Sequence, residues 1–218
     1  MTTLQTRKPV SPGEPAPDFD LPAVNGTGIV SLAEYRGSSA VFLALMIGLW
    51  CPFCRRAIAQ IAANEPKLKA IGVETVVVIA TPPENAQLYF KFRPNRLRLA
   101  ADPALSTHRA YGLPKPEPTP EFIHALETVK INPDGALSEP MPITEAATAI
   151  AKLDGYVENE TDRADTERQW PQLKGQFLID RAGVVRWAKI ECAEGFSTIG
   201  SFPSLDEILS VAQTVQRG

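Results

Sequence analysis

The sequence has few of the residues from which metal centres and disulfide frameworks are built. Its 218 residues include 3 cysteines and 2 histidines. Three cysteines are too few for a structural disulfide framework in a chain of this length. A structural zinc site needs four ligands, but beyond one close cysteine pair only Cys192, His108 and His124 remain, each isolated in the sequence. We therefore expect no metal ion.

Long hydrophobic runs are also lacking. The longest apolar stretch extends from Ala40 to Trp50 and is interrupted only by Gly48, far short of the roughly 20 residues that a membrane helix needs. The first residues contain no apolar run that could serve as the core of a signal peptide. These absences predict a protein without a membrane segment that stays in the cytoplasm.

The charge is close to balanced. The formal net charge is −3 and the isoelectric point is about 5.5, so neither nucleic acid nor an anionic membrane is indicated as a partner. Gly26-Thr27-Gly28 is too short a glycine motif to indicate a nucleotide site, and no nucleotide or flavin cofactor is implied. Hydrophobic residues make up 44% of the chain, which is enough for a substantial core.

The first part of the chain predicts alternating strands and helices. Residues 1–13, rich in Pro, Ser and Thr, are expected to form a flexible arm, and 14–217 one domain. The elements expected up to residue 112 are a short helix over Val30–Gly37, a strand over Val41–Ile47, a helix after Cys51 that Pro66 ends or kinks, a strand over Glu74–Ala80, a helix from Pro83, a strand over Leu97–Ala101 and a helix over Ala104–Tyr111. This order predicts a parallel core sheet.

Residues 113–172 interrupt this pattern. They begin with a spaced proline run and continue with mixed short elements, including an almost wholly polar helix over Asp162–Gln169 that should be largely solvated. The remaining elements expected after residue 112 are helices over Glu121–Glu127 and Thr144–Leu153, a strand over Val129–Ile131, a hairpin of Gln176–Asp180 and Val184–Ile190, and a closing helix over Leu205–Val215. The fold class is therefore α/β, a central mixed sheet flanked by helices with an insertion before the last hairpin.

The pair Cys51 and Cys54 carries the chemistry. Helix positions i and i+3 lie on one face, so their sulfurs can form a disulfide without long chain travel. Cys51 follows a predicted strand and would occupy the exposed start of a helix, where free N–H groups and the helix dipole favour a thiolate. Pro52 suits the first helical position. Cys51 is the predicted nucleophile and Cys54, one turn deeper, the resolving thiol.

Residues around the pair have weaker indications. Trp50 is expected to be half exposed beside Cys51 and to shape a surface for a partner, whereas Arg55 and Arg56 are more often solvated helix charges than thiolate partners. Cys192 is expected to be a single buried or edge cysteine, with a third redox thiol as the alternative. His108 and His124 are expected to be ordinary helix residues.

Several segments resemble the peroxiredoxin-like branch of the alkyl hydroperoxide reductase/thiol-specific antioxidant superfamily, a group with the thioredoxin fold that is also close to cytochrome-maturation thioredoxins. They are Gly13–Pro22, Ser31–Gly37, the redox motif Trp50-Cys51-Pro52-Phe53-Cys54-Arg55, and Gly175–Trp187. The resemblance implies a thioredoxin-like fold, an antioxidant or redox activity, and reduction by a thioredoxin or glutaredoxin system.

The sequence departs from both subfamilies. Peroxide-reducing members place Thr or Ser three residues before the reactive Cys and Pro four residues earlier still, where this chain has Gly48 and Ala44. They use a late Arg to bind peroxide, where this chain has Lys174. Thioredoxins place a cis-proline facing the cysteine pair, and Pro171 is expected to come too early for that role.

These observations favour a thiol–disulfide oxidoreductase that cycles between the Cys51/Cys54 dithiol and disulfide. One alternative is a peroxidase in which Cys51 becomes a sulfenic acid and Cys54 condenses with it. Another is a redox-regulated binding module whose segment 113–172 docks a partner. We expect this segment either to cover the rim of the active site or to form a contact between subunits, because an insertion of this length is uncommon unless it has a use. Without the hydroxyl and the guanidinium, we expect slow reaction with peroxides.

Overall fold

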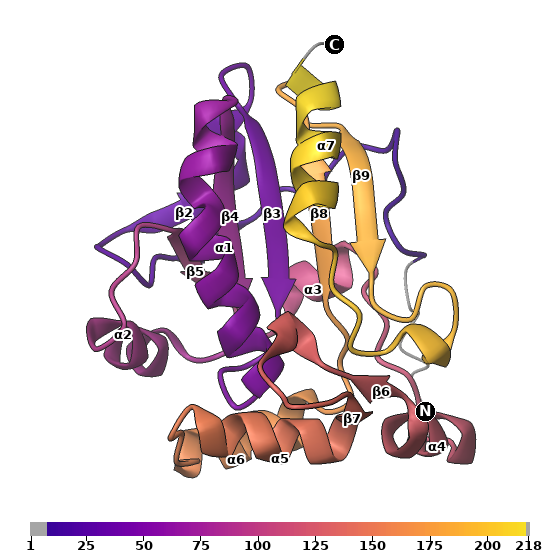
Figure 1. The fold of residues 1–218 in the computed structure, drawn as a ribbon. Coiled ribbons are helices and arrows are strands. Elements are labelled where there is room, and N and C mark those ends of the chain that lie inside the picture. The colour runs from indigo at the N-terminus through magenta and orange to yellow at the C-terminus, as the bar shows by residue number, and fades with distance from the viewer. Residues whose placement is uncertain (1–7, 217–218) are drawn as a thin grey trace, which may run out of the picture.

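A five-stranded mixed sheet organises the structure, a computed structural model that describes residues 8–216 (Figure 1). The strand order is β5-β4-β3-β8-β9; β3, β4 and β5 are parallel, β8 is antiparallel to β3, and β9 is antiparallel to β8. The bounds are β3 Ala40–Met46, β4 Val73–Ile79, β5 Arg98–Ala101, β8 Gly175–Ile179 and β9 Val185–Ile190. The mixed sheet and the late hairpin predicted from the sequence are confirmed.

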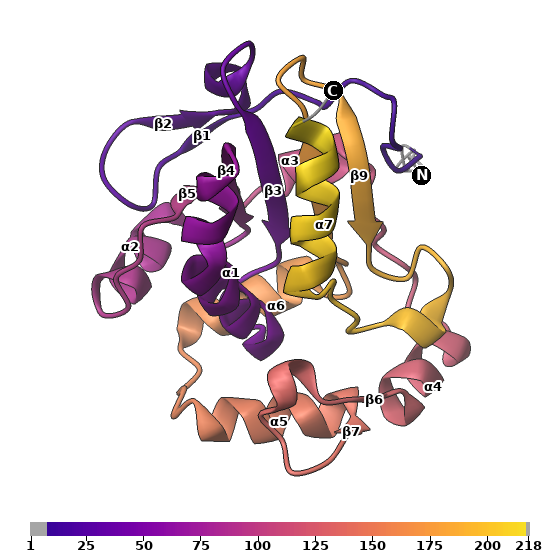
Figure 2. The same cartoon turned by 45° about the horizontal axis from the view of Figure 1, so that its top comes forward.

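Both faces of the sheet are covered, which is why every residue of β3 is buried. Helices α1 (Pro52–Ala70) and α7 (Leu205–Gln216) lie on one face, with α2 (Pro83–Lys91) at its edge (Figures 1 and 2). The other face carries α3 (Ser106–Ala110), the N-terminal segment and a hairpin of β1 (Asp20–Pro22) and β2 (Ile29–Ser31). The short helix expected over Val30–Gly37 is the 3₁₀ helix η1 (Leu32–Tyr35).

The insertion gathers at one end of the sheet. Figures 1 and 2 show its elements beneath the end where β3 stops and α1 begins. They are α4 (Pro120–Thr128), β6 (Lys130–Ile131), the 3₁₀ helix η2 (Pro133–Gly135), β7 (Met141–Pro142), α5 (Ile143–Leu153) and α6 (Glu160–Gln169); the 3₁₀ helix η3 (Phe196–Thr198) precedes α7. Since parallel strands and the helices that follow them meet at this end, the insertion covers the loop that carries the cysteine pair.

Two predicted details need correction. Of the two alternatives for Pro66, the one in which it ends the helix is wrong, since α1 continues to Ala70. Pro66 lies on the exposed side of α1, and Leu68, two residues later, is buried. Helix α6 is not largely solvated, since Asp162, Asp165 and Gln169 are buried. The buried face of α6 consists of polar residues that are held by hydrogen bonds and not by apolar contacts, so the composition of the helix gives no sign of it.

The beginning of the described chain is packed on the domain. Val10 is buried, and its N–H donates to the carbonyl of Tyr111. This part of the segment expected to be a flexible arm is therefore anchored, while residues 1–7 of that expectation lie outside the described residues. Between residues 8 and 216, none of the helices has both the length and the hydrophobicity needed to cross a bilayer.

Candidate active site

Cys51 stands at the start of α1, as predicted. It is the N-cap residue, Pro52 occupies the first turn, and the Cys51 N–H donates to the carbonyl of Gly48 in a tight turn that links β3 to the helix. The expectation that Cys51 is exposed is wrong, because its exposed fraction is only 3%. The insertion covers the helix start and removes Cys51 from solvent.

The two thiols of the pair are in contact and differ in acidity. Both are free, and the backbone N–H of Cys54 donates to Cys51 Sγ at 3.3 Å. Burial would raise the pKa of Cys51, but the hydrogen bond from the Cys54 thiol, the charge of Lys174 and the Cys54 N–H outweigh it and lower that pKa to about 7. Burial and the neighbouring Cys51 sulfur raise the pKa of Cys54 well above its ordinary value.

Lys174 and Glu191 form a buried ion pair beside the sulfurs. The register places them there: Leu45 near the end of β3 pairs with Gly175 at the start of β8, and Gly175 pairs with Ile190 at the end of β9. The residues that flank these ends, Lys174 and Glu191, therefore reach the same edge of the sheet as the loop before Cys51.

Three hydrogen bonds hold the Glu191 carboxylate. Lys174 Nζ lies 2.9 Å from Glu191 Oε1, which also accepts from the Gly200 N–H at 2.8 Å, and Glu191 Oε2 accepts from the Lys174 N–H at 3.2 Å. Burial alone would lower the pKa of Lys174, but Glu191 and the sulfur of Cys51 raise it above its ordinary value. Lys174 thus remains an ammonium ion near Cys51.

The two arginines after Cys54 are not solvated helix charges, contrary to expectation. Arg55 is buried, and its Nη1 donates to the carbonyls of Leu49 at 2.7 Å and Trp50 at 3.2 Å. Its guanidinium lies 3.7 Å from the ring centroid of Tyr156 in the insertion. Arg56 pairs with two insertion residues, Asp134 at 3.1 Å and Asp154 at 2.6 Å. Both side chains therefore hold the insertion and the active-site loop together.

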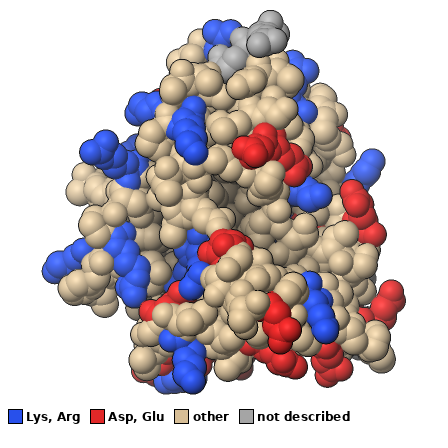
Figure 3. Space-filling view, in the orientation of Figure 1, with Lys and Arg blue, Asp and Glu red and all other residues tan. Residues whose placement is uncertain are grey.

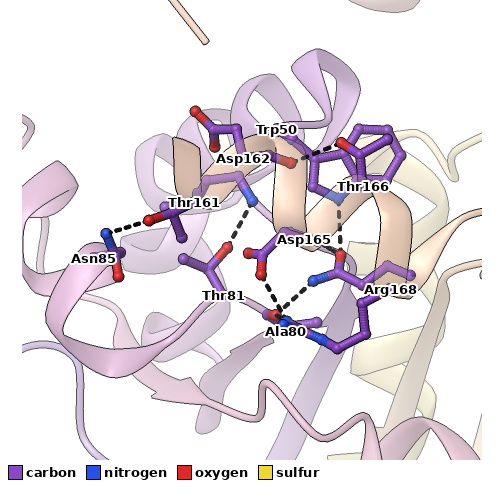
Figure 4. Close-up of polar contacts among 12 residues, drawn as sticks. Trp50, Ala80, Thr81, Asn85, Thr161, Asp162, Asp165, Thr166 and Arg168 are labelled. Carbon is purple, nitrogen blue, oxygen red and sulfur yellow. Dashed lines mark hydrogen bonds and ion pairs between the residues drawn. The ribbon is translucent and has the colours of Figure 1, made fainter. Parts of the chain in front are cut away.

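Gln169 of α6 holds the loop before Cys51. Its Oε1 accepts from the Gly48 N–H at 2.6 Å and from Trp50 Nε1 at 2.8 Å, and its Nε2 donates to the carbonyl of Ala80 at 2.6 Å. Figure 4 shows how α6 faces this loop and the residues after β4, with Arg168 also reaching Ala80. The polar face of α6 thus supports the residues around the cysteine pair.

A cavity of about 190 Å³ opens above Cys51. Trp50, partly buried as expected, Pro52, Phe53 and Lys174 line it on the domain side. The insertion contributes Phe122, Leu126, Ile143, Thr144, Ala147, Trp170 and Pro171. This confirms the prediction that residues 113–172 cover the rim of the site.

The position of Pro171 also bears on the sequence analysis. The bond between Trp170 and Pro171 is cis, and Pro171 lines the same cavity as Cys51. The proline therefore lies at the same cavity as Cys51, although Gln172, Leu173 and Lys174 separate it from β8.

Comparison with known proteins agrees with these features. The model of the AhpC/TSA family matches residues 12–188, which is most of the chain. The chain belongs to the AhpC/TSA family. No curated protein gives a significant match to it.

Solved structures show that this AhpC/TSA protein shares the thioredoxin-like fold. A Chlorobium tepidum protein assigned as a thiol:disulfide interchange protein DsbE is 22% identical, with a TM-score of 0.52 over 96% of this chain and 99% of that one. The reduced 2-Cys peroxiredoxin of Plasmodium vivax is 18% identical, with a TM-score of 0.59 over 96% and 83%. Peroxidoxin BcpB of Mycobacterium tuberculosis is 14% identical, with a TM-score of 0.57 over 94% and 98%.

The remaining candidates lie apart from this cavity. Cys192 is partly buried after β9, and burial raises its pKa to about 12. His108 is fully buried in α3, where burial lowers its pKa to about 4, and His124 lies on α4. Within residues 8–216, no three His, Cys, Asp or Glu side chains are grouped as a metal site requires.

Sequence reasoning did not identify Glu191 and Gln169. Glu191 directly follows the predicted last strand, so pairing that strand with the one after Lys174 could have indicated the ion pair. Gln169 carries no comparable signal, since it ends a polar helix whose buried face depends on where the insertion folds.

Proposed function

We propose that this AhpC/TSA protein is a thiol–disulfide oxidoreductase in which Cys51 attacks and Cys54 resolves. The observation that carries the proposal is the difference between the two thiols. A pKa of about 7 makes Cys51 about half thiolate at neutral pH, while Cys54 stays protonated until it is needed. The optimum attacking thiol has a pKa near ambient pH, because nucleophilicity falls as the pKa falls further.

The reaction follows from these roles. The Cys51 thiolate attacks one sulfur of a substrate disulfide, forms a mixed disulfide and expels a thiolate. Cys54 then loses its proton to the solution or to the departing thiolate and attacks Cys51 Sγ, which expels the second thiol. The substrate gains two electrons and two protons, and the protein is left with a Cys51–Cys54 disulfide. The ammonium of Lys174, beside the sulfurs, favours the thiolate form of Cys51.

A peroxidase is the alternative, and the surroundings of Gly48 argue against it. A Cβ added there would lie 2.6 Å from Trp50 Cδ1 and 2.8 Å from Gln169 Oε1, so the space for a hydroxyl-bearing side chain is already filled. The charge that could take the place of the guanidinium, Lys174, is bonded to Glu191. Loss of one preorganised donor typically costs about 10²–10³ in rate.

The proposal extends to partners and location. We infer that a thioredoxin or glutaredoxin system in the cytoplasm reduces the Cys51–Cys54 disulfide again. The exposed part of the insertion is the surface on which we expect a partner or a second copy of the chain to dock. A binding module regulated by the redox state, without turnover, is the remaining alternative.

Stopped-flow kinetics tests the proposal. Reduced protein is mixed side by side with hydroxyethyl disulfide, hydrogen peroxide and an alkyl hydroperoxide. We expect the disulfide to oxidise the protein, Cys51→Ser to abolish the reaction, and Cys54→Ser to stop it at the mixed disulfide. Peptide mapping should find the 51–54 bridge and a reduced Cys192. Fast peroxide reduction without disulfide exchange would reject the proposal in favour of the peroxidase.

A further inference from the structure

The cavity above Cys51 limits what can reach the sulfur. Its volume is about 190 Å³, and an apolar cavity of about 150 Å³ can hold benzene. Cys51 itself is only 3% exposed. A disulfide exposed on a folded protein would have to bring its whole surrounding surface past the roof formed by α4 and α5, whereas a substituent the size of a phenyl group fits beneath it.

The walls of the cavity are apolar along most of their extent. Phe122, Leu126, Ile143, Ala147 and Trp170 come from the insertion, and Ile47, Phe53 and Ile199 from the rest of the chain. The exposed Thr144 and the partly exposed Trp170 lie at the rim, so the cavity opens to solvent on their side. An apolar substituent that enters is transferred from water to hydrocarbon.

The charges of the cavity are already paired. Lys174 and Glu191, the charged residues among those that line it, lie 2.9 Å apart and neutralise each other. An anionic disulfide such as glutathione disulfide would lose hydration on entry and find no free cation. Because a buried charge without a partner is costly, the cavity disfavours charged substituents.

We propose that the cavity is a substrate site for small apolar disulfides, with one uncharged organic substituent of up to phenyl size under α4 and α5. This inference rests on the proposed thiol–disulfide activity. The thiolate of Cys51 bonds to the sulfur that carries the substituent in the cavity, and the other half of the disulfide leaves as a thiolate toward the rim. Attack of Cys54 on Cys51 then releases the bound half as a thiol.

Methanethiosulfonate reagents test the site because they share one reactive centre. Each forms a mixed disulfide with Cys51 and releases methanesulfinate, so only the substituent differs. We expect the benzyl reagent to react at least about tenfold faster than the sulfonatoethyl reagent, after each rate is divided by that with free cysteine. Insulin supplies a disulfide on a protein for comparison. We expect the reduced protein to reduce insulin more slowly than it reacts with either reagent.

Two variants and a control place the effect in the cavity. Ala147→Leu fills its wall and Thr144→Phe narrows its mouth at an exposed position, and each should reduce the preference for the benzyl reagent by about tenfold. Thr148→Leu, on the exposed side of the same helix, should leave it unchanged. The pKa of Cys51, measured by thiolate absorbance at 240 nm, should stay near 7 in all three.

The outcomes separate the two proposals. Equal normalised rates for the two reagents, rapid reduction of insulin, or an unchanged preference in both cavity variants would overturn the substrate site. A clear preference for the benzyl reagent with a mixed disulfide that Cys54 never resolves would support the site and reject the oxidoreductase.

Discussion

At the scale of single residues, the chemistry depends on an asymmetry between two identical side chains. Cys51 caps α1 and receives the Cys54 N–H, whereas Cys54 lies within the first turn, fully buried. The ammonium of Lys174 lowers the pKa of both thiols, but only Cys51 also receives hydrogen bonds that favour its thiolate. Cys51 is therefore partly ionised and able to attack at neutral pH, whereas Cys54 is protonated.

Replacing Lys174 by Met should raise the pKa of Cys51. A rise of one unit in the pKa of Cys51 would leave about a tenth of this thiol ionised at pH 7 instead of about half. A titration at 240 nm and the alkylation rate should report the same shift. Lys189→Met on β9, whose side chain pairs with no buried acid among the described residues, is the matched control.

The Lys174→Met variant also leaves the Glu191 carboxylate buried without its ion partner, which costs about 3–5 kcal/mol of stability. The double variant with Glu191→Gln removes that charge and should refold well, with the pKa of Cys51 still above 7 because Lys174 has the larger effect. A pKa that stays near 7 in both variants would show that Lys174 has no part in activating Cys51.

Gly48→Thr tests whether the missing hydroxyl alone explains slow peroxide reaction. The new side chain must displace Trp50 and Gln169, and such overpacking typically costs about 1–3 kcal/mol. We expect a lower melting temperature, a changed tryptophan fluorescence and no gain in peroxide rate. Gly135→Thr serves as a surface control with open space around its Cβ, although its positive φ adds strain of its own. A stable variant with a much faster peroxide reaction would contradict this account.

How far single residues could be predicted depends on the range of their contacts. Cys51 and Cys54 were identified because strand, proline and cysteine spacing are local signals. The burial of Arg55 was not predicted, because its partner Tyr156 lies about a hundred positions away in the insertion. Lys174 was noticed through resemblance alone, and its partner Glu191 only becomes evident once the register of β8 and β9 is known.

At the scale of elements, the insertion is held over the site by polar contacts with α1. Asp154, at the end of α5, accepts two hydrogen bonds from Arg56, at 2.6 and 3.1 Å. Asp154→Ala should loosen α5 above Cys51. A bulky maleimide should then label Cys51 several-fold faster, while iodoacetamide labels it at an unchanged rate because small reagents already enter.

Glu158→Ala provides the matched control for this change. Glu158 lies in the same connection between α5 and α6 but is exposed, so its loss should alter neither rate. Equal gains for the large and the small reagent in Asp154→Ala would instead indicate a changed thiol acidity, and no gain would show that the insertion does not restrict access.

The core elements and the position of the insertion at the rim of the site could be predicted, but the contacts that the insertion makes could not. A continuous apolar run in the sequence identifies a buried strand such as β3, because both of its faces are covered. Helix α6 has almost no apolar residue, so periodicity gives no face to bury, and its contacts with Gly48 and Ala80 exist only after the chain has returned to the sheet.

At the scale of the whole molecule, one arrangement serves both fold and chemistry. The sheet brings the ends of β3, β8 and β9 to one edge, and the insertion closes that edge into a cavity (Figure 1). On the face drawn in Figure 3, basic and acidic side chains both occur and neither sign covers the whole face.

The acidity of Cys51 should also appear in the stability of the reduced protein. Its pKa falls from about 9 in the unfolded chain to about 7 in the fold. A group with a lowered folded pKa contributes stability that is complete above the unfolded pKa and is lost as the pH falls through the folded one. At 1.36 kcal/mol per unit, the reduced protein should gain about 2–3 kcal/mol between pH 6 and pH 9 relative to Cys51→Ser.

Denaturant unfolding at several pH values under reducing conditions measures this gain. The other two thiols act in the opposite direction: their pKa values are raised in the fold, so they cost some stability as the pH approaches 9 and the unfolded thiols ionise. Both are present in the wild type and in Cys51→Ser, so this loss cancels in the difference between the two proteins. Cys192→Ser should show a rise as large as that of the wild type or slightly larger, because it lacks the small loss of stability that ionisation of Cys192 in the unfolded chain causes near pH 9. A difference between wild type and Cys51→Ser that stays flat from pH 6 to pH 9 would mean that Cys51 is an ordinary thiol, and the proposed division of labour between Cys51 and Cys54 would lose its physical basis.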